Sequence, residues 1–175
     1  MADTDNNLAL IGMPGAGKST LGVLLAKRTA RSFLDTDLLI QKAEGASLQQ
    51  IIEQRGVESF RAVEERIVLG LDCSSCVIAT GGSVVYSRAA MEHLGRLGRR
   101  IYLDVPFAEL ERRLGDLDKR GVIRGPGQDL ESLLAERRAL YERWADIRVS
   151  CEELEHDAWV DAIIHALAPA QTPAR

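Results

Sequence analysis

The sequence lacks an uninterrupted apolar run of about 18 residues, the length at which a segment becomes a candidate for a membrane-spanning helix. It also lacks a broad excess of basic residues, because its formal net charge is −4 at pH 7. A general nucleic-acid-binding surface needs many cations to meet the phosphate backbone, so we expect neither nucleic acid nor a membrane as a partner. The first ten residues, MADTDNNLAL, lack the basic and apolar regions of a secretory signal, and we expect a cytoplasmic protein.

Cysteine is scarce, and the count of three does not favour a disulfide framework. Cys73 and Cys76 nevertheless form a C-x-x-C spacing in LDCSSCVIAT, a pattern that also occurs at redox and metal sites. A structural zinc site needs four ligands, and only Cys151 and three scattered histidines are left to complete one. We therefore interpret the pair as small residues at a helix-to-strand turn, with the metal or redox role as the alternative.

The remaining composition is typical of one α/β domain. A chain of 175 residues with 46% hydrophobic residues can bury a sizeable core, and no repeat or long linker divides it. We expect a single domain over residues 1–175, with its core at about 8–167. Apolar runs alternate with helical patterns, which predicts a parallel sheet flanked by helices. The expected strands are 8–11, 33–34, 76–79, 101–105 and 147–149, and the expected helices are 18–29, 37–44, 47–54, 58–71, 87–96, 107–114, 129–143 and 155–167.

The stretch GMPGAGKST fits the phosphate-binding loop pattern of two glycines four residues apart followed by lysine and serine. It stands between an expected strand and an expected helix, so the helix N-terminus would face the phosphates. Lys18 would neutralise β and γ oxygens of ATP, and the Ser19 hydroxyl would ligate Mg²⁺. The alternative is a glycine turn that binds nothing. The predicted nucleotide-binding residues of this loop are Gly12, Met13, Pro14, Gly15, Ala16, Gly17, Lys18, Ser19 and Thr20.

One long segment, GDLDKRGVIRGPGQD at residues 115–129, is too polar for a core. It contains four glycines, one proline and six charged residues. Such a composition is typical of a mobile loop over a site, and we expect a lid at about 114–128.

Taken in order, GMPGAGKST, LDTD, FRAVEE, ATGGS and the arginine-bearing lid resemble the shikimate kinase family, which are P-loop kinases of the nucleoside-monophosphate-kinase fold class. The resemblance runs from about residue 8 to 149. It implies a three-layer α/β/α fold with a five-stranded parallel sheet and a mobile lid. It also implies ATP and Mg²⁺ as cofactors, shikimate as the acceptor and shikimate 3-phosphate as the product. We expect the protein to act as a monomer.

LDTD supplies two carboxylates near the phosphate loop. The resemblance implies that Asp35 faces the Mg²⁺ shell through water, and that Asp37 holds the acceptor hydroxyl and acts as a base. Both would stand at the carboxyl end of the second strand, beside the phosphate loop. The alternative is a helix N-cap, for which Asp37 ahead of LLIQKAE is suited.

The resemblance also implies residues on the acceptor side, which includes helices at about 37–61. Arg61 and Arg137 would bind the acceptor carboxylate, although a one-residue shift would exchange Arg137 with Arg138. Glu64 would orient Arg61. Gly81 and Gly82 would let the backbone approach the acceptor closely. The sequence departs from the family pattern after these two glycines, because a serine at position 83 stands in place of a third glycine.

On the nucleotide side, the resemblance assigns Arg113 and the lid residue Arg120, the latter also as a catalytic residue with Lys18 and Asp37. The lid departs from the family as well, since Arg120 is followed by Gly121-Val122-Ile123 rather than by proline and two leucines. The departures keep two alternatives open beside shikimate kinase activity. One is a related kinase for another small hydroxy acid such as homoserine, and the other is a non-enzymatic ATP-binding switch.

Overall fold

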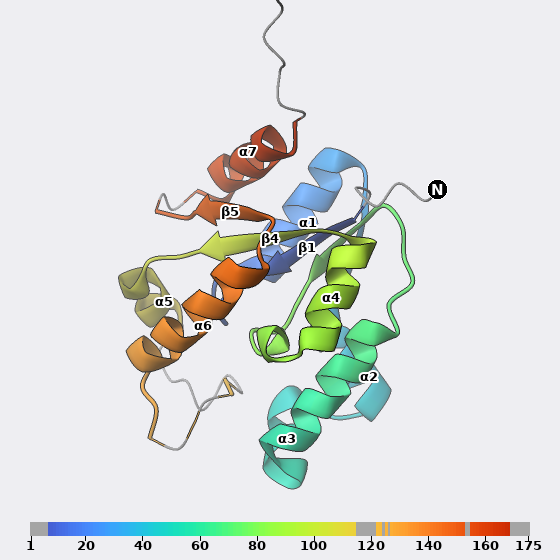
Figure 1. Ribbon diagram of the computed structural model, residues 1–175, viewed down its shortest axis with the longest axis vertical. Helices are drawn as coiled ribbons and strands as arrows, with labels where there is room; N and C mark the ends of the chain where they lie inside the picture. The colour runs from blue at the N-terminus through green and yellow to red at the C-terminus, as the bar shows by residue number, and fades with distance from the viewer. Residues whose placement is uncertain (1–6, 115–121, 124, 126, 153–154, 169–175) are drawn as a thin grey trace, which may run out of the picture.

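A computed structural model describes residues 7–114, 122–123, 125, 127–152 and 155–168. Five strands form one sheet in the order β2-β3-β1-β4-β5, and every neighbouring pair is parallel. Figure 1 shows α1 and α7 on one face of this sheet and α4 and α6 on the other. The strands are β1 (Asn7–Ile11), β2 (Ser32–Asp35), β3 (Cys76–Ala79), β4 (Gly98–Asp104) and β5 (Ile147–Ser150). The helices are α1 (Lys18–Thr29), α2 (Thr36–Glu44), α3 (Leu48–Leu69), α4 (Arg88–Leu97), α5 (Phe107–Leu114), α6 (Leu130–Trp144) and α7 (His156–Leu167).

The two central strands explain why the sheet is parallel and covered on both faces. Every residue of β1 and of β3 is buried, and these runs are almost entirely apolar. A strand whose two faces are both covered by helices reads as a continuous apolar run rather than an alternating one. The predicted three-layer α/β/α fold with five parallel strands is therefore confirmed.

The sequence predicted two helices, 47–54 and 58–71, where the structure has the single span α3. Gly56 interrupts this span with φ 80° and ψ 169°, so the two predicted helices correspond to its two halves. Ser47 begins the first half with a capping box, since its hydroxyl accepts from the Gln50 backbone and Gln50 accepts from the Ser47 backbone. The second half carries Phe60 into a small apolar cluster with Ile51. This cluster fixes the half of α3 that carries Arg61 and Glu64.

The topology gathers several predicted site residues at one edge of the sheet. The loop 12–17 follows β1, Asp35 ends β2, and Gly81 is the second residue after β3. These strands are adjacent and parallel, so their carboxyl ends share an edge, where open α/β sheets bind ligands.

Cys76 begins β3 and is buried, with its backbone N–H donated to Asn7 Oδ1 at 2.8 Å. Cys73, Cys76 and Cys151 are free thiols. Within the described ranges, no group of three or more His, Cys, Asp or Glu residues is arranged to hold a metal ion. None of the described helices combines the length and the apolar character needed to cross a membrane.

Candidate active site

The loop between β1 and α1 turns through three glycines with positive φ, Gly12 at 147°, Gly15 at 76° and Gly17 at 89°. Gly17 is the N-cap residue of α1 and has no side chain to cap it, which leaves the first N–H groups of the helix for an anion. Lys18 is only 7% exposed, and its Nζ donates to the carbonyl oxygens of Gly12 and Met13, at 2.8 Å each. The loop thus holds its own cation in place.

Burial lowers the pKa of Lys18 from 10.5 to about 8, while the nearby carboxylate of Asp37 acts in the opposite direction. The ammonium group is therefore still the main form at neutral pH. A buried ammonium group interacts with a phosphate more strongly than an exposed one, because the surroundings screen it less.

Ser19 and Asp35 lie together beside the loop, as the sequence predicted. The Ser19 hydroxyl donates to Asp35 Oδ2 at 2.6 Å. The other carboxylate oxygen, Oδ1, accepts the backbone N–H groups of Asp37 at 2.9 Å and of Leu38 at 3.4 Å. Asp35 is therefore the N-cap of α2, and the alternative that made Asp37 the cap is wrong. A hydroxyl and a carboxylate oxygen are hard ligands of the type Mg²⁺ prefers, so this pair fits the ion.

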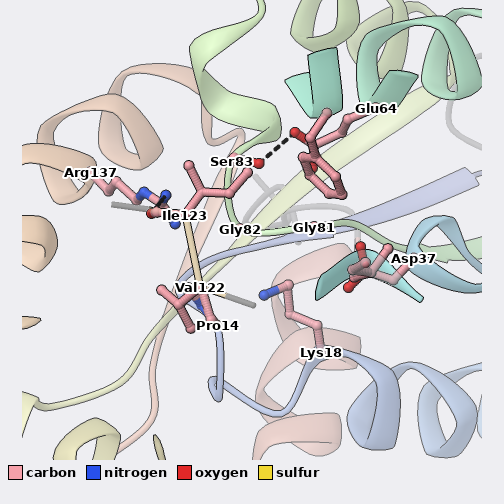
Figure 2. A pocket seen from close by; sticks show the side chains of 12 residues that line it. Pro14, Lys18, Asp37, Glu64, Gly81, Gly82, Ser83, Val122, Ile123 and Arg137 are labelled. Carbon is pink, nitrogen blue, oxygen red and sulfur yellow. Dashed lines mark hydrogen bonds between the residues drawn. The ribbon is translucent and has the colours of Figure 1, made fainter. Parts of the chain in front are cut away.

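A pocket opens next to the loop, between α2, α3, the end of β3 and α6. Figure 2 shows the side chains of Lys18, Asp37 and Arg137 around this opening. Asp37 is half-buried there, and burial raises the pKa of its carboxyl, against the opposing effect of Lys18. The residues that line the pocket are Pro14, Lys18, Asp37, Leu48, Phe60, Glu64, Gly81, Gly82, Ser83, Val122, Ile123 and Arg137.

Gly81 and Gly82 permit close packing in this pocket. A Cβ at Gly81 would lie 2.2 Å from Glu64 Oε1, and one at Gly82 would lie 2.6 Å from Pro14 Cδ. Real Cβ atoms do not approach other atoms so closely, so a larger residue at either position would push the pocket walls apart. The Gly81 N–H is already donated to Thr36 Oγ1 at 3.2 Å.

Of the two neighbouring arginines that the sequence left open, Arg137 lines the pocket and Arg138 does not. Arg137 is 1% exposed, and its Nη2 donates to the carbonyl oxygen of Ile123 at 2.5 Å. Arg138 instead pairs with Asp104, with Nη2 2.8 Å from Oδ1. The two side chains leave α6 in different directions, and only Arg137 faces the pocket.

Arg61 does not line this pocket. Its side chain lines an adjoining hollow that shares Glu64 and Ser83 with the pocket. There its Cζ lies 4.3 Å from the centre of the Tyr86 ring, and its Nη1 lies 3.5 Å from Glu58 Oε1. The sequence predicted that Arg61 binds the acceptor carboxylate together with Arg137, and this contact stays a prediction.

Glu64 is 2% exposed and is bonded to Ser83 rather than to Arg61. The Ser83 hydroxyl donates to Glu64 Oε2 at 2.6 Å, as Figure 2 shows. Glu64 Oε1 and Arg61 Nε are buried and have no hydrogen-bond partner among the described residues. The serine that replaces a third glycine thus uses its hydroxyl to hold a buried carboxyl group at the wall of the pocket. Burial raises the pKa of that carboxyl from 4.5 to about 7.

The raised pKa of Glu64 predicts a pH dependence of stability. In the folded protein the carboxyl keeps its proton up to about pH 7, whereas in the unfolded chain it ionises near 4.5. The folded state therefore binds more protons in this interval, and its free energy of unfolding falls as the pH rises through it. Glu64→Gln removes this effect, so the stability of the variant relative to wild type should rise by up to about 3 kcal/mol between pH 4.5 and 7.

Urea unfolding of both proteins at half-unit pH steps measures this difference. A stability difference that stays constant from pH 4.5 to 7 would show that Glu64 titrates as it does in the unfolded chain.

A second hollow lies on the other side of the loop, where the sequence placed the nucleotide. Arg113 lines this hollow. Its Nε donates to Glu109 Oε1 at 2.5 Å, and its Nη1 donates to the carbonyl oxygen of Gly15 at 3.3 Å. A Cβ at Gly17 would lie 3.4 Å from Arg113 Nη1 and 3.5 Å from His156 Nε2. This hollow is lined by Gly15, Gly17, Lys18, Ser19, Thr20, Glu109, Arg112, Arg113 and His156. Arg120, predicted as the lid arginine, lies outside the described residues.

Sequence reasoning missed Tyr86, Thr36, Glu109 and His156. Glu109 stands four residues before Arg113 on α5, a spacing that signals a possible ion pair. His156 and Tyr86 carry no such signal, because only the tertiary fold brings His156 to the hollow beside Arg113 and Tyr86 to Arg61.

The phosphate-binding loop after β1, with a pocket lined by Lys18 and Asp37 beside it, defines the class of P-loop kinases. A family model described as shikimate kinase matches residues 14–168. A shikimate kinase of Synechococcus sp. (strain RCC307) is 44% identical over 150 residues, which are 83% of this chain and 76% of that protein. The structure of shikimate kinase from Acinetobacter baumannii in complex with shikimate matches with a TM-score of 0.86 and 30% identity over 94% of each chain.

The chain belongs to the shikimate kinase family, and it is an ATP-dependent phosphotransferase that acts on an alcohol group. Another relative is Threonine synthase-like 1 of Macaca fascicularis, which is 36% identical over 150 residues, 85% of this chain but 20% of that protein.

Proposed function

We propose that this protein transfers the γ-phosphoryl group of ATP to a hydroxyl group of shikimate, giving ADP and shikimate 3-phosphate. The observation that carries the proposal is one pocket, beside the phosphate-binding loop, that is lined by Lys18, Asp37 and Arg137. A cation near the phosphates, a carboxylate for the hydroxyl and a buried guanidinium for a carboxylate are the three groups that phosphorylation of a hydroxy acid needs.

In the proposed reaction, Asp37 accepts a hydrogen bond from the acceptor hydroxyl and orients its oxygen toward the γ-phosphorus. The new oxygen–phosphorus bond forms as the bond to the β,γ-bridging oxygen of ATP breaks and ADP leaves. Asp37 takes the proton of the hydroxyl, and Lys18 stabilises the negative charge that accumulates on the β and γ oxygens.

The residues around this centre have proposed roles of their own. Ser19 and Asp35 would hold Mg²⁺, which when bound supplies charge neutralisation at the phosphates. The loop residues 12–20 and Arg113 would bind ATP, and Arg120 would close over it from the lid at about 114–128. Arg61 and Arg137 would bind the carboxylate of the acceptor, and Gly81 and Gly82 its ring. We also propose that the protein is cytoplasmic and acts as a monomer.

A related kinase activity on another small hydroxy acid, such as homoserine, is the second candidate. Ser83 favours it, because a serine side chain at the pocket wall leaves less space for the acceptor than a glycine would. A relative named Threonine synthase-like 1 also matches 85% of this chain, so similarity to the chain is not restricted to proteins named shikimate kinase.

A coupled assay of ADP release, run with shikimate, homoserine and a panel of small hydroxy acids, separates the two candidates. We expect turnover that depends on shikimate and saturates with it. Turnover with homoserine and none with shikimate would select the second candidate.

Replacing Arg137 with alanine should chiefly weaken binding of the acceptor. A desolvated pair between a guanidinium and a carboxylate is worth about 2–5 kcal/mol when one partner is removed, and ATP binds on the other side of the loop. Calorimetry of acceptor and ATP binding measures both effects.

Arg138→Ala is the matched control, because Arg138 occupies the next position of α6 and pairs with Asp104 outside the pocket. Equal losses of acceptor affinity in the two variants would mean that Arg137 does not meet the carboxylate.

A further inference from the structure

Tyr86 is a contact shared by two arginines from different helices. It ends a short 3₁₀ turn, Val84–Tyr86, that follows the glycines after β3. The Cζ atoms of Arg61, on α3, and Arg137, on α6, lie 4.3 Å and 5.3 Å from the centre of its ring. An aromatic ring attracts a cation within about 6 Å of its centre, so both guanidinium groups are within range of one ring.

The phenol oxygen fixes the ring and one of the arginines. It accepts a hydrogen bond from Arg137 Nε at 3.3 Å and donates one to Glu136. Glu136 is held in turn by Gln128, whose Nε2 donates to it at 2.8 Å. The hydrogen bond from Tyr86 lowers the pKa of the Glu136 carboxyl, so a negative charge stands behind the phenol. Tyr86 is therefore anchored at its oxygen while its ring contacts the cations.

Arg61 depends on this ring more than on its ionic partner. Its pairing with Glu58 spans 3.5 Å, and the Glu58 side chain is 90% exposed, so solvent screens the pair. Glu64, which the family resemblance made the orienting residue, has its Oε2 bonded to Ser83 instead. The ring of Tyr86 is thus a closer partner of Arg61 than a hydrogen-bonded carboxylate is in this structure.

We propose that Tyr86 is a positioning residue for the carboxylate of the acceptor. It holds Arg61 and Arg137 against one ring, where the two hollows adjoin, so that one carboxylate receives hydrogen bonds from both. Planar guanidinium groups bind a carboxylate through paired hydrogen bonds whose geometry depends on orientation, and a shared ring sets that orientation. The inference rests on the proposed function, since it requires an acceptor that carries a carboxylate.

Steady-state kinetics of Tyr86→Leu and Tyr86→Phe test the proposal. Leucine removes the ring, and we expect the KM for the acceptor to rise about 10-fold while kcat changes by less than about 3-fold. Phenylalanine keeps the ring and removes the hydroxyl, and should raise this KM only about 2- to 3-fold. The KM for ATP should stay at the wild-type value in both variants.

A second measurement separates positioning of the arginines from a merely structural role. It asks whether the effect of Tyr86→Leu on KM depends on the carboxylate of the acceptor. With a carboxamide analogue of the acceptor, wild type and Tyr86→Leu should have the same KM, since neither arginine then has an anion to bind. Arg88→Ala is the matched control, because Arg88 lies two residues further along, is exposed and pairs with Glu92. If Tyr86→Leu does not fold, as judged by its melting curve, Tyr86→Gln replaces it as a ringless variant.

The outcomes separate this inference from the proposed function. Wild-type protein that turns over no carboxylate acceptor would overturn both. Wild-type turnover together with an unchanged acceptor KM in the ringless variant would overturn the role of Tyr86 alone. An equal rise in KM for the acceptor and its carboxamide analogue would also overturn it, because the effect would then not pass through the arginines.

Discussion

Replacing Lys18 with alanine is expected to lower kcat by roughly 10²- to 10³-fold, the scale on which loss of one well-placed group that stabilises transition-state charge reduces a rate. Lys18 is held within the loop by the carbonyl oxygens of Gly12 and Met13, so its ammonium group is in position before ATP binds. No other residue among 12–20 has a cationic side chain. The coupled ADP-release assay at saturating ATP and acceptor measures the loss.

Lys27→Ala is the matched control for this variant. Lys27 lies on the same helix, α1, in its exposed last turn, and it should keep the wild-type rate. Near-wild-type turnover in Lys18→Ala would show that the loop shapes the protein but does not contribute its lysine to phosphoryl transfer.

Asp37→Asn should reduce kcat by roughly 10²-fold or more, because a group that accepts the proton of the acceptor hydroxyl acts in the transition state. The helix should be unaffected, since the cap of α2 is Asp35 and the backbone N–H of Asp37 donates to it. Melting temperature and kcat are measured on the same preparation. An unaltered melt with an unaltered rate would leave the proposed reaction without its carboxylate.

Asp35→Asn provides the contrast. Its carboxylate lies 2.6 Å from the Ser19 hydroxyl, at the proposed Mg²⁺ site. Higher Mg²⁺ concentration should therefore restore part of its activity, and it should not restore that of Asp37→Asn. Equal rescue of the two variants would contradict the separate roles of the two carboxylates.

The sequence predicted the strands well where burial alone decides them. The runs at 8–11 and 76–79 are apolar throughout, and the structure adds only Asn7 to the first. It predicted β4 less well, because the strand begins at Gly98 rather than Ile101. Arg100 belongs to β4, and its Nη2 lies 2.8 Å from Asp146 Oδ1. A charged residue thus lengthens the strand because it has a partner that is distant in the sequence.

The candidate site divides in the same way. The phosphate-binding loop could be predicted because all its residues are consecutive. The choice between Asp35 and Asp37 as cap could not, since it depends on β2 pairing with β3, which keeps Asp35 extended opposite Ala79. The contact of Arg61 with Tyr86 joins residues from α3 and the turn after β3, and no local pattern indicates it.

The most direct test of the account is to identify the phosphorylated product. Wild-type protein is incubated with ATP, Mg²⁺ and shikimate, and ³¹P NMR follows the phosphorus of the γ-phosphoryl group. The account predicts one phosphomonoester signal, coupled to the ring proton at position 3, that grows in equal amount with ADP and grows roughly 10²- to 10³-fold more slowly in Lys18→Ala. Release of inorganic phosphate alone, at a rate that shikimate does not change, would contradict it.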